Sequence, residues 1–298
     1  MRQRQRKGFS KMKNVIITGA NSGLGFETAK KIAADHDFRV ILACRNEEKA
    51  ARAKSEIISA TGNEQIVSMK LDTSSLASVR AFAAAFIDRY GTVDVLINNA
   101  GISPMRESGV TEEGFEVVFA TNYLGHFLLT QLFLPHFSAD GRILNVTSDM
   151  HNPPGGIEWK GVEYLAHDAL SDRQRYSYSK LCMIYFTHKL AEVLKEQGSS
   201  VTVNSFNPGF MATTNFSGGH MDKARALVVK TTMPDRYGDL ETSSDALARI
   251  AIDPQFGGVS GLYYDRSTNI KGSSDLSYVK ENQEELWQKS LEYCGIRA

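Results

Sequence analysis

Short apolar stretches alternate with longer amphipathic stretches along most of the chain. The short stretches are continuous and rich in β-branched residues, which is typical of strands covered on both faces, and the longer ones have helical periodicity. We expect seven strands, at residues 14–18, 39–44, 65–71, 93–97, 142–146, 200–206 and 261–264. Helices are expected at residues 25–34, 47–60, 75–90 and 176–196. This alternation predicts one doubly wound α/β domain, with a central parallel sheet of about seven strands and helices on both faces.

The domain is expected to span residues 14–298, because no repeat or low-complexity linker interrupts it. Residues 1–13 carry six basic side chains and are expected to form a disordered arm. Two irregular stretches, residues 149–172 and 209–238, are expected to form substrate loops, since long loops in compact domains often serve as lids or binding loops. The alternative for each is a surface loop without a role.

The composition is that of a globular protein, with 42% hydrophobic and 23% charged residues. Lys+Arg and Asp+Glu balance at 34 each, so we expect no nucleic-acid partner. Residues 123–137 form the most apolar stretch, but the polar side chains within it predict no integral membrane segment. The three cysteines form neither a disulfide nor a metal-ligand pattern, which predicts a cytoplasmic protein without a metal site.

The first predicted strand leads directly into a glycine-rich turn, Thr18-Gly19-Ala20-Asn21-Ser22-Gly23-Leu24-Gly25, and the first helix follows. Glycines there allow a tight turn and a close approach of the backbone to a pyrophosphate. The helix N-terminus offers N–H groups and a partial positive charge to the same anion. The position between a strand and a helix favours dinucleotide binding over a purely structural turn.

The second predicted strand ends at Cys44, without an acidic residue, and Arg45 follows it. Enzymes that prefer NAD place a carboxylate there, which binds the ribose 2′-hydroxyl and would repel a 2′-phosphate. The guanidinium of Arg45 suits a phosphate instead, so the sequence favours NADP(H), although Ser22 adds no second basic contact. The alternative is that Arg45 is a solvated residue at a strand end.

Tyr176 and Lys180 lie four residues apart on a predicted helix and therefore share one face. A positive charge about 4 Å from a phenol contributes roughly 4 kcal/mol, enough to lower a tyrosine pKa by about 3 units. We expect Lys180 to lower the pKa of Tyr176 in this way, so that Tyr176 can act as acid and base. A second copy of the pattern, Tyr185 and Lys189, lies about 13.5 Å further along the helix and faces the other way, which predicts that Tyr185 is a core or subunit-contact residue.

The motifs and their order along the chain resemble those of the short-chain dehydrogenase/reductase family, and the resemblance covers nearly the whole chain. The glycine turn resembles the family's TGxxxGxG motif, and Asn98-Asn99-Ala100-Gly101 resembles its NNAG motif. Other stretches are similar to the retinol dehydrogenase and light-dependent protochlorophyllide reductase branch, among them Leu124-Gly125-His126 and Ser148-Asp149-Met150-His151.

The resemblance implies a Rossmann fold and four catalytic residues. Ser148 would bind the carbonyl oxygen, Tyr176 would transfer the proton, Lys180 would bind the nicotinamide ribose, and Asn122 would hold a relay water. Beside the glycine turn it implies cofactor contacts from Arg45, Asp72, Thr73, Asn99, Ala100, Gly101, Tyr176, Lys180, Pro208, Gly209 and Thr213. The alternative for Asp72 is a helix N-cap, and both roles could hold together.

The implied activity is hydride transfer between NADP(H) and a carbonyl or alcohol of a bulky apolar substrate. Residues expected to line its pocket are Met150, Trp159, Tyr164, Phe210, Met211 and Phe216, with loop-anchoring packing as the alternative. The competing functions are reduction of an activated C=C bond by the same residues and a non-catalytic NADP-binding sensor or scaffold. The helices with residues 127–137 and 181–194 look apolar over more than one face, which predicts a homodimer or homotetramer.

Overall fold

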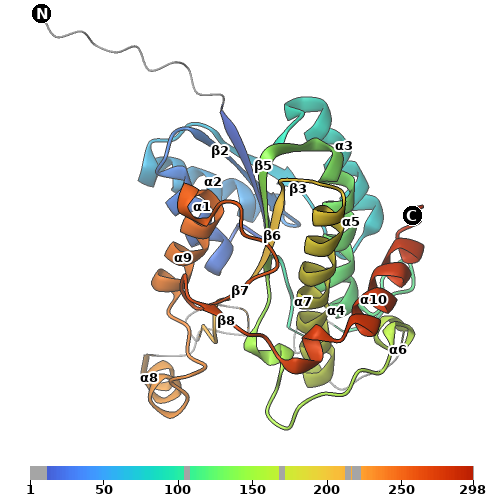
Figure 1. The fold of residues 1–298 in the computed structure, drawn as a ribbon. Coiled ribbons are helices and arrows are strands. Elements are labelled where there is room, and N and C mark those ends of the chain that lie inside the picture. The colour runs from blue at the N-terminus through green and yellow to red at the C-terminus, as the bar shows by residue number, and fades with distance from the viewer. Residues whose placement is uncertain (1–11, 104–107, 168–171, 212–215, 217–222, 298) are drawn as a thin grey trace, which may run out of the picture.

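The computed structural model describes residues 12–103, 108–167, 172–211, 216 and 223–297. Its strands form one sheet in the order β3-β2-β1-β4-β5-β6-β7-β8 (Figure 1). The strands are β1 (Lys13–Thr18), β2 (Phe38–Cys44), β3 (Ile66–Lys70), β4 (Val93–Asn98), β5 (Phe137–Val146), β6 (Thr202–Asn207), β7 (Tyr263–Asp265) and β8 (Ile270–Lys271). Strands β1 to β7 pair in parallel and β8 runs antiparallel to β7. The predicted doubly wound parallel sheet is confirmed, and β8 adds an edge that the sequence analysis did not predict.

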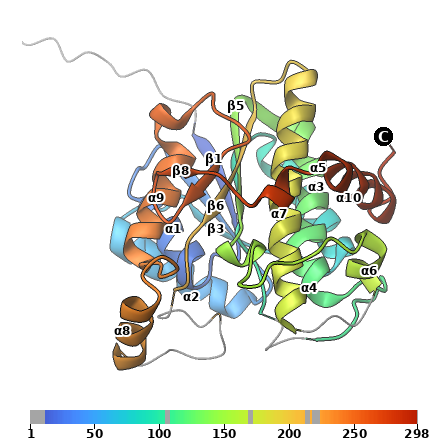
Figure 2. The same ribbon diagram turned by 60° about the horizontal axis from the view of Figure 1, so that its bottom comes forward.

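Helices cover both faces of this sheet (Figures 1 and 2). One face carries α1 (Gly23–Ala33), α2 (Glu47–Thr61) and α9 (Leu240–Ile252), and the other carries α3 (Leu76–Tyr90), α5 (Gly125–Phe133) and α7 (Asp172–Glu196). The remaining helices are α4 (Val117–Phe119), the π-helical turn Ala120–Leu124, α6 (Val162–His167), α8 (Lys223–Thr232) and α10 (Lys280–Tyr293). Alternate residues of a strand enter opposite cores: Ile16 packs on the α3 and α5 side, whereas Val15 and Ile17 pack on the α1 and α9 side.

Helix caps set the boundaries near the expected cofactor edge. Asn46 caps α2 by accepting a hydrogen bond from Lys49 N–H at 2.8 Å, and Ser75 caps α3 by accepting one from Ser78 N–H at 3.2 Å. Asp72 instead accepts hydrogen bonds from the main chain and the hydroxyl of Ser74. The N-cap role considered for Asp72 is therefore wrong, and Ser75 takes it.

The apolar face of α7 that predicted self-association is covered by α10 of the same chain. Trp287 of α10 packs edge-on against Phe127 with 5.3 Å between ring centroids, and its centroid lies 6.3 Å from that of Phe186. The hydroxyl groups of Tyr123 and Ser290 are hydrogen bonded at 2.7 Å beside this cluster. The apolar pattern of these helices therefore does not require a partner subunit.

The helical run Val117–His136 is long and apolar enough to cross a membrane by length and composition, with a mean hydropathy of 1.3. This run begins before residues 123–137, the stretch whose polar side chains predict no membrane segment. Across an 18-residue stretch of this run, 78% of the residues are buried inside the fold, where the run packs between α3 and α7. This is the environment of a core helix.

Gly125, at the start of α5, leads to a stability prediction. A Cβ atom there would lie 1.9 Å from the carbonyl oxygen of Thr73, a backbone atom that cannot rotate away. We expect Gly125→Ala to lower the free energy of unfolding by about 3 kcal/mol or more, because overpacking against a fixed backbone has no cheap relief. The matched control is Gly272→Ala, whose Cβ would meet nothing within 4 Å. Denaturant melts of both variants test this, and equal midpoints would contradict it.

Candidate active site

The glycine-rich turn joins β1 to α1 at the point where the strand order reverses. Gly19 has φ +66°, and a Cβ there would lie 2.9 Å from Cα of Ala100. Ser22, the N-cap residue of α1, makes no side-chain cap hydrogen bond, in contrast to the caps of α2 and α3. A Cβ at Gly25 would lie 2.5 Å from Nδ2 of Asn99. The turn thus combines a cradle that side chains would fill with helix N–H groups that suit a pyrophosphate.

The turn after β4 is fastened to the glycine turn by Thr18. The Thr18 hydroxyl oxygen accepts hydrogen bonds from the main-chain N–H groups of Asn99 and Ala100, both at 2.8 Å. The side-chain amide of Asn99 donates back to the carbonyl oxygen of Thr18 at 2.7 Å. The predicted cofactor residues Thr18, Asn99 and Ala100 are therefore hydrogen bonded together where the strand order reverses, which is where open α/β sheets have their ligand crevice.

The end of β2 lies against the same turn. Cys44 is buried, and burial raises the pKa of its thiol to about 11 in spite of hydrogen bonds from the backbone of Ala20 and Asn21. Arg45, the next residue, is exposed. A guanidinium at this position stands at the rim of the predicted dinucleotide site, where a ribose substituent would be recognised.

Asn122 lies in the π-helical turn and is fully buried. Its side-chain amide donates to the carbonyl oxygen of Ile102 at 3.1 Å and to Oγ of Ser179 at 3.0 Å. Its Oδ1 accepts a hydrogen bond from Ile102 N–H at 2.8 Å. Three hydrogen bonds within the protein thus fix the side chain of Asn122, and its expected role in holding a relay water stays a prediction.

Ser148 follows β5 and lies beside Tyr176, with which it is hydrogen bonded. The Ser148 hydroxyl also donates to the carboxylate of Asp149 at 3.2 Å. Burial and the charge of Asp149 raise the pKa of Tyr176 above its ordinary value, and the bond with Ser148 opposes them. In this structure Tyr176 is thus a protonated phenol at neutral pH.

Lys180 is buried one turn further along α7. Its Nζ donates to the carbonyl oxygen of Val146 at 3.1 Å and lies 5.7 Å from the ring centroid of Tyr176. Burial lowers the pKa of Lys180 to about 8. Burial is the largest effect on the pKa of Tyr176 and raises it, whereas Lys180 is not among the groups that shift it here, so the expected lowering by Lys180 stays a prediction.

The second Tyr-x-x-x-Lys copy faces away from the site, as predicted. Tyr185 is fully buried, donates to the carbonyl oxygen of Leu276 at 3.0 Å and accepts from Asn282 at 2.9 Å. Lys189 forms an ion pair with Glu284 at 2.7 Å. Tyr185 is a core residue that helps α10 to pack against α7.

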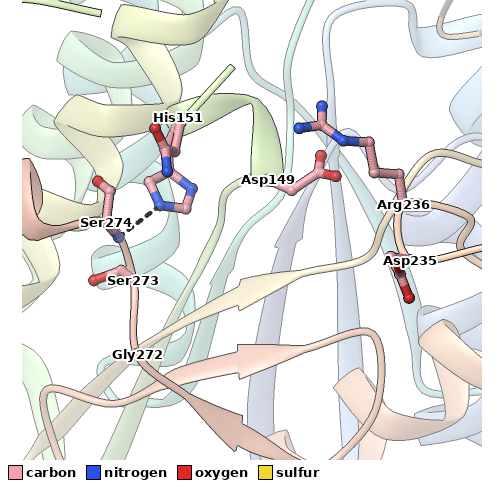
Figure 3. Close-up of a pocket in the computed structure, with 8 residues that line it drawn as sticks. Asp149, His151, Asp235, Arg236, Gly272, Ser273 and Ser274 are labelled. Atoms are coloured by element: carbon pink, nitrogen blue, oxygen red, sulfur yellow. Dashed lines mark hydrogen bonds between the residues drawn. The ribbon is translucent and has the colours of Figure 1, made fainter. Parts of the chain in front are cut away.

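A hollow of about 280 Å³ lies next to Ser148, between the residues that follow β5 and the residues that follow β8 (Figure 3). It is lined by Asp149, His151, Asn152, Asp235, Arg236, Gly272, Ser273 and Ser274. Figure 3 shows Asp149 and Arg236 on one side of the hollow and His151 on the other. This lining is more polar than the apolar pocket that the sequence predicts.

Among the aromatic residues expected to line a substrate pocket, Phe216 contacts the predicted centre, with its ring centroid 5.6 Å from that of Tyr176. Trp159 instead donates to Glu285 of α10 at 2.7 Å and packs edge-on against Tyr185, so its expected place in the pocket is wrong. Tyr164 likewise packs against the core on the α10 side.

The predicted substrate loop 209–238 begins shortly after β6. Gly209 has φ +74°, and the carbonyl oxygen of Pro208 accepts a hydrogen bond from the Ser243 hydroxyl at 2.9 Å. Met150 contacts Arg236, with 3.8 Å between Sδ and Nη1, and Met211 packs against the α1 and α9 core. The main chain of Phe210 pairs with that of Tyr237. Thr213 lies outside the described residues.

Two buried histidines lie in the site. His126 contacts Thr18 and Asn122, and His151 contacts Ser148 and Ser274. The signal that could have identified His126 is a histidine among apolar residues of a core helix, one turn after Asn122. For His151 the signal is its position three residues after the predicted carbonyl-binding serine.

Comparisons with known proteins agree with this geometry. Residues 13–158 match the family model of short chain dehydrogenases. The chain is similar to human retinol dehydrogenase 13, with 36% identity over 96% of this chain and 86% of that protein, and to human polyprenol dehydrogenase, with 32% identity over 94% and 84%. A solved structure of an uncharacterized protein from Mycobacterium paratuberculosis has a TM-score of 0.73 and 30% identity, covering 96% of this chain and 94% of that one.

The two tyrosines give a paired prediction. Tyr176→Phe keeps the ring that packs against Phe216 but removes the proton, so we expect oxidoreductase turnover to fall by about 10²- to 10⁴-fold while affinity for the nicotinamide cofactor stays nearly unchanged. Tyr185→Phe should keep turnover and lower the free energy of unfolding by about 1 kcal/mol through its lost hydrogen bonds. Steady-state kinetics and melting curves of both variants distinguish the two roles, and an equal loss of turnover would disprove the assignment.

Proposed function

This chain belongs to the short-chain dehydrogenase/reductase family, and from that premise we propose that it transfers hydride between NADP(H) and the carbonyl or alcohol of a bulky apolar substrate. The observation that carries the proposal is that the predicted catalytic residues come together. Lys180 donates to the carbonyl oxygen of Val146 at the end of β5 and lies 5.7 Å from the ring centroid of Tyr176, and Asn122 donates to Ser179 of the same helix. This group of side chains lies at the carboxyl ends of β4 and β5, where ligands bind in open α/β sheets.

The residues present fit a dinucleotide. The glycine turn and the uncapped start of α1 would hold the pyrophosphate, and the Asn99–Gly101 turn would follow the chain of the cofactor. Asp72 and Thr73 after β3 would lie on the adenine side, and Pro208 and Gly209 after β6 on the nicotinamide side. When bound, the cofactor supplies or accepts the hydride, and every proton is handled by side chains of the protein.

The electrostatics of the site favour reduction of a carbonyl. A phenol whose pKa is raised by burial keeps its proton at neutral pH and can give it to an oxygen that becomes an alkoxide. Ser148 would hold that oxygen beside Tyr176. Lys180, whose pKa of about 8 keeps it cationic at neutral pH, would bind the ribose and balance the charge left on Tyr176.

The preference for NADP(H) rests on the end of β2. No carboxylate occupies position 44, and the guanidinium of Arg45 is exposed beside the turn. A 2′-phosphate would gain a charge-assisted contact there, whereas NAD(H) would find no acidic partner for its 2′-hydroxyl.

The substrate class rests on the relatives and on Phe216. Retinol dehydrogenase 13 and polyprenol dehydrogenase are named for long apolar alcohols, and Phe216 places an apolar ring against Tyr176. The polar hollow beside Ser148 would then face the reacting end of the substrate rather than its apolar body.

Self-association as a homodimer or homotetramer stays a prediction, and it would have to use another surface than the α7 face that α10 covers. A cytoplasmic location also stays a prediction, which the three free, buried cysteines support.

Oxidation of NADPH with all-trans-retinal tests the proposed function. We expect loss of NADPH absorbance with formation of retinol, and none with the Tyr176→Phe variant. Chromatography of the products separates the competing activity, since reduction of a C=C bond would leave the aldehyde intact. Tight NADPH binding without turnover on retinal, a polyprenal and a steroid ketone would support a sensor and contradict the proposal.

Arg45 provides the test of cofactor choice. Arg45→Ala should weaken NADPH binding by about 1.5–3 kcal/mol, or roughly ten- to more than a hundredfold, and leave NADH nearly unaffected. Adding Cys44→Asp should shift the preference toward NADH, because a carboxylate there accepts from a 2′-hydroxyl and repels a phosphate. The matched control is Arg52→Ala, an exposed arginine of α2 paired with Glu48. Fluorescence titrations decide, and equal weakening of both cofactors by Arg45→Ala would rule out a phosphate contact.

A further inference from the structure

His126 is a fully buried histidine in α5, one helical turn after Asn122. Both of its ring nitrogens have a polar partner. Nδ1 lies 3.1 Å from the main-chain carbonyl oxygen of Asn122, and Nε2 lies 3.0 Å from the hydroxyl oxygen of Thr18. The imidazole therefore bridges the helix that carries Asn122 and the strand end that carries the cofactor turn.

The hydrogen-bond partners of the His126 ring determine which of its two nitrogens carries the proton. A carbonyl oxygen can only accept, so the contact with Asn122 requires a proton on Nδ1. The Thr18 hydroxyl already accepts two hydrogen bonds, from the N–H groups of Asn99 and Ala100, which use both of its lone pairs. Its single proton can go to Nε2 of His126 at 3.0 Å or to the carbonyl oxygen of Ile97 at 3.4 Å. The shorter contact makes Nε2 an unprotonated acceptor.

We propose that His126 is a positioning residue that, as the neutral Nδ1–H tautomer, holds the carbonyl of Asn122 in register with the Asn99–Ala100 turn. The inference rests on the proposed function, in which Asn122 supports the proton relay and the Asn99–Ala100 turn contacts the cofactor. One imidazole keeps these two parts of the site aligned. Thr18 and His126 are 108 residues apart, and the bridge joins the two halves of the crevice without any solvent exposure.

The surroundings favour the neutral ring. Burial lowers the pKa of His126 to about 4, the bond to Asn122 opposes this, and the nearby ammonium of Lys180 adds to it. A proton on Nε2 would face a hydroxyl oxygen without a free lone pair, so one N–H of the Asn99–Ala100 turn would lose its acceptor. A neutral imidazole thus satisfies every group in the bridge, and an imidazolium does not.

The first test compares three variants in the full-length protein, at a temperature well below their melting points. His126→Phe removes both contacts at similar size, and we expect a roughly tenfold weaker NADPH affinity together with a roughly tenfold lower kcat on all-trans-retinal. His126→Asn keeps an N–H donor near Asn122 but cannot reach Thr18, so kcat should recover to within about threefold while NADPH binding stays weak. His188→Phe is the matched control, since that ring donates from Nδ1 to the carbonyl oxygen of Ser277 and stacks on Tyr278, without contact to Asn122 or Thr18.

The control should change only the melting temperature. His126→Phe would overturn the proposal if it did the same, with unchanged kcat and NADPH affinity. If that variant does not fold, long-range 1H–15N spectra of histidine-labelled wild type decide, with the His126 signal assigned from the His126→Asn variant. We expect a protonated Nδ1 and an unprotonated Nε2 at neutral pH, and a proton on Nε2 would refute the bridge. Failure of wild type to reduce retinal would count against the proposed function alone. NADPH binding and the spectra would still test the positioning role of His126.

Discussion

The hydroxyl group of Thr18 is the contact on which the rest of the site depends. It ends the central strand β1 and accepts the N–H groups of Asn99 and Ala100 from the neighbouring strand end, while its own proton points toward His126. Leaving either N–H without an acceptor inside the protein would cost about 1–3 kcal/mol. Because the strand order reverses between β1 and β4, this one hydroxyl holds both walls of the cofactor crevice together.

Burial acts in opposite directions on the two ionisable groups of the site. It raises the pKa of Tyr176 and lowers the pKa of Lys180, since in each case the low dielectric disfavours the charged form. At neutral pH the pair is therefore a neutral phenol and an ammonium, which is the state that the proposed carbonyl reduction requires. Running the reaction toward the ketone would need an additional positive charge near Tyr176, and an oxidised nicotinamide ring carries one.

Much of the fold and of the catalytic group was predictable from local patterns. The seven parallel strands and the face carrying Tyr176 follow from periodicity, which is a property of short segments. What covers a face is not local: the apolar pattern of α7 suits a partner subunit and α10 of the same chain equally well, and only the packing of Trp287 decides. Trp159 was misplaced for the same reason, because Glu285, its partner, lies 126 residues away.

The bonding roles of His126 and His151 depend on which ring nitrogen carries the proton, and no sequence motif records this. His151 repeats the bonding of His126: its Nδ1 lies 2.7 Å from the carbonyl oxygen of Ser148, and its Nε2 accepts from Ser274 N–H at 3.0 Å (Figure 3). Each ring thus forms a hydrogen bond with the main chain of one predicted catalytic residue and another with a segment far away in the sequence. A neutral imidazole suits this task, since it is rigid, donates at one end and accepts at the other, and brings no charge into a site whose chemistry depends on where charge develops.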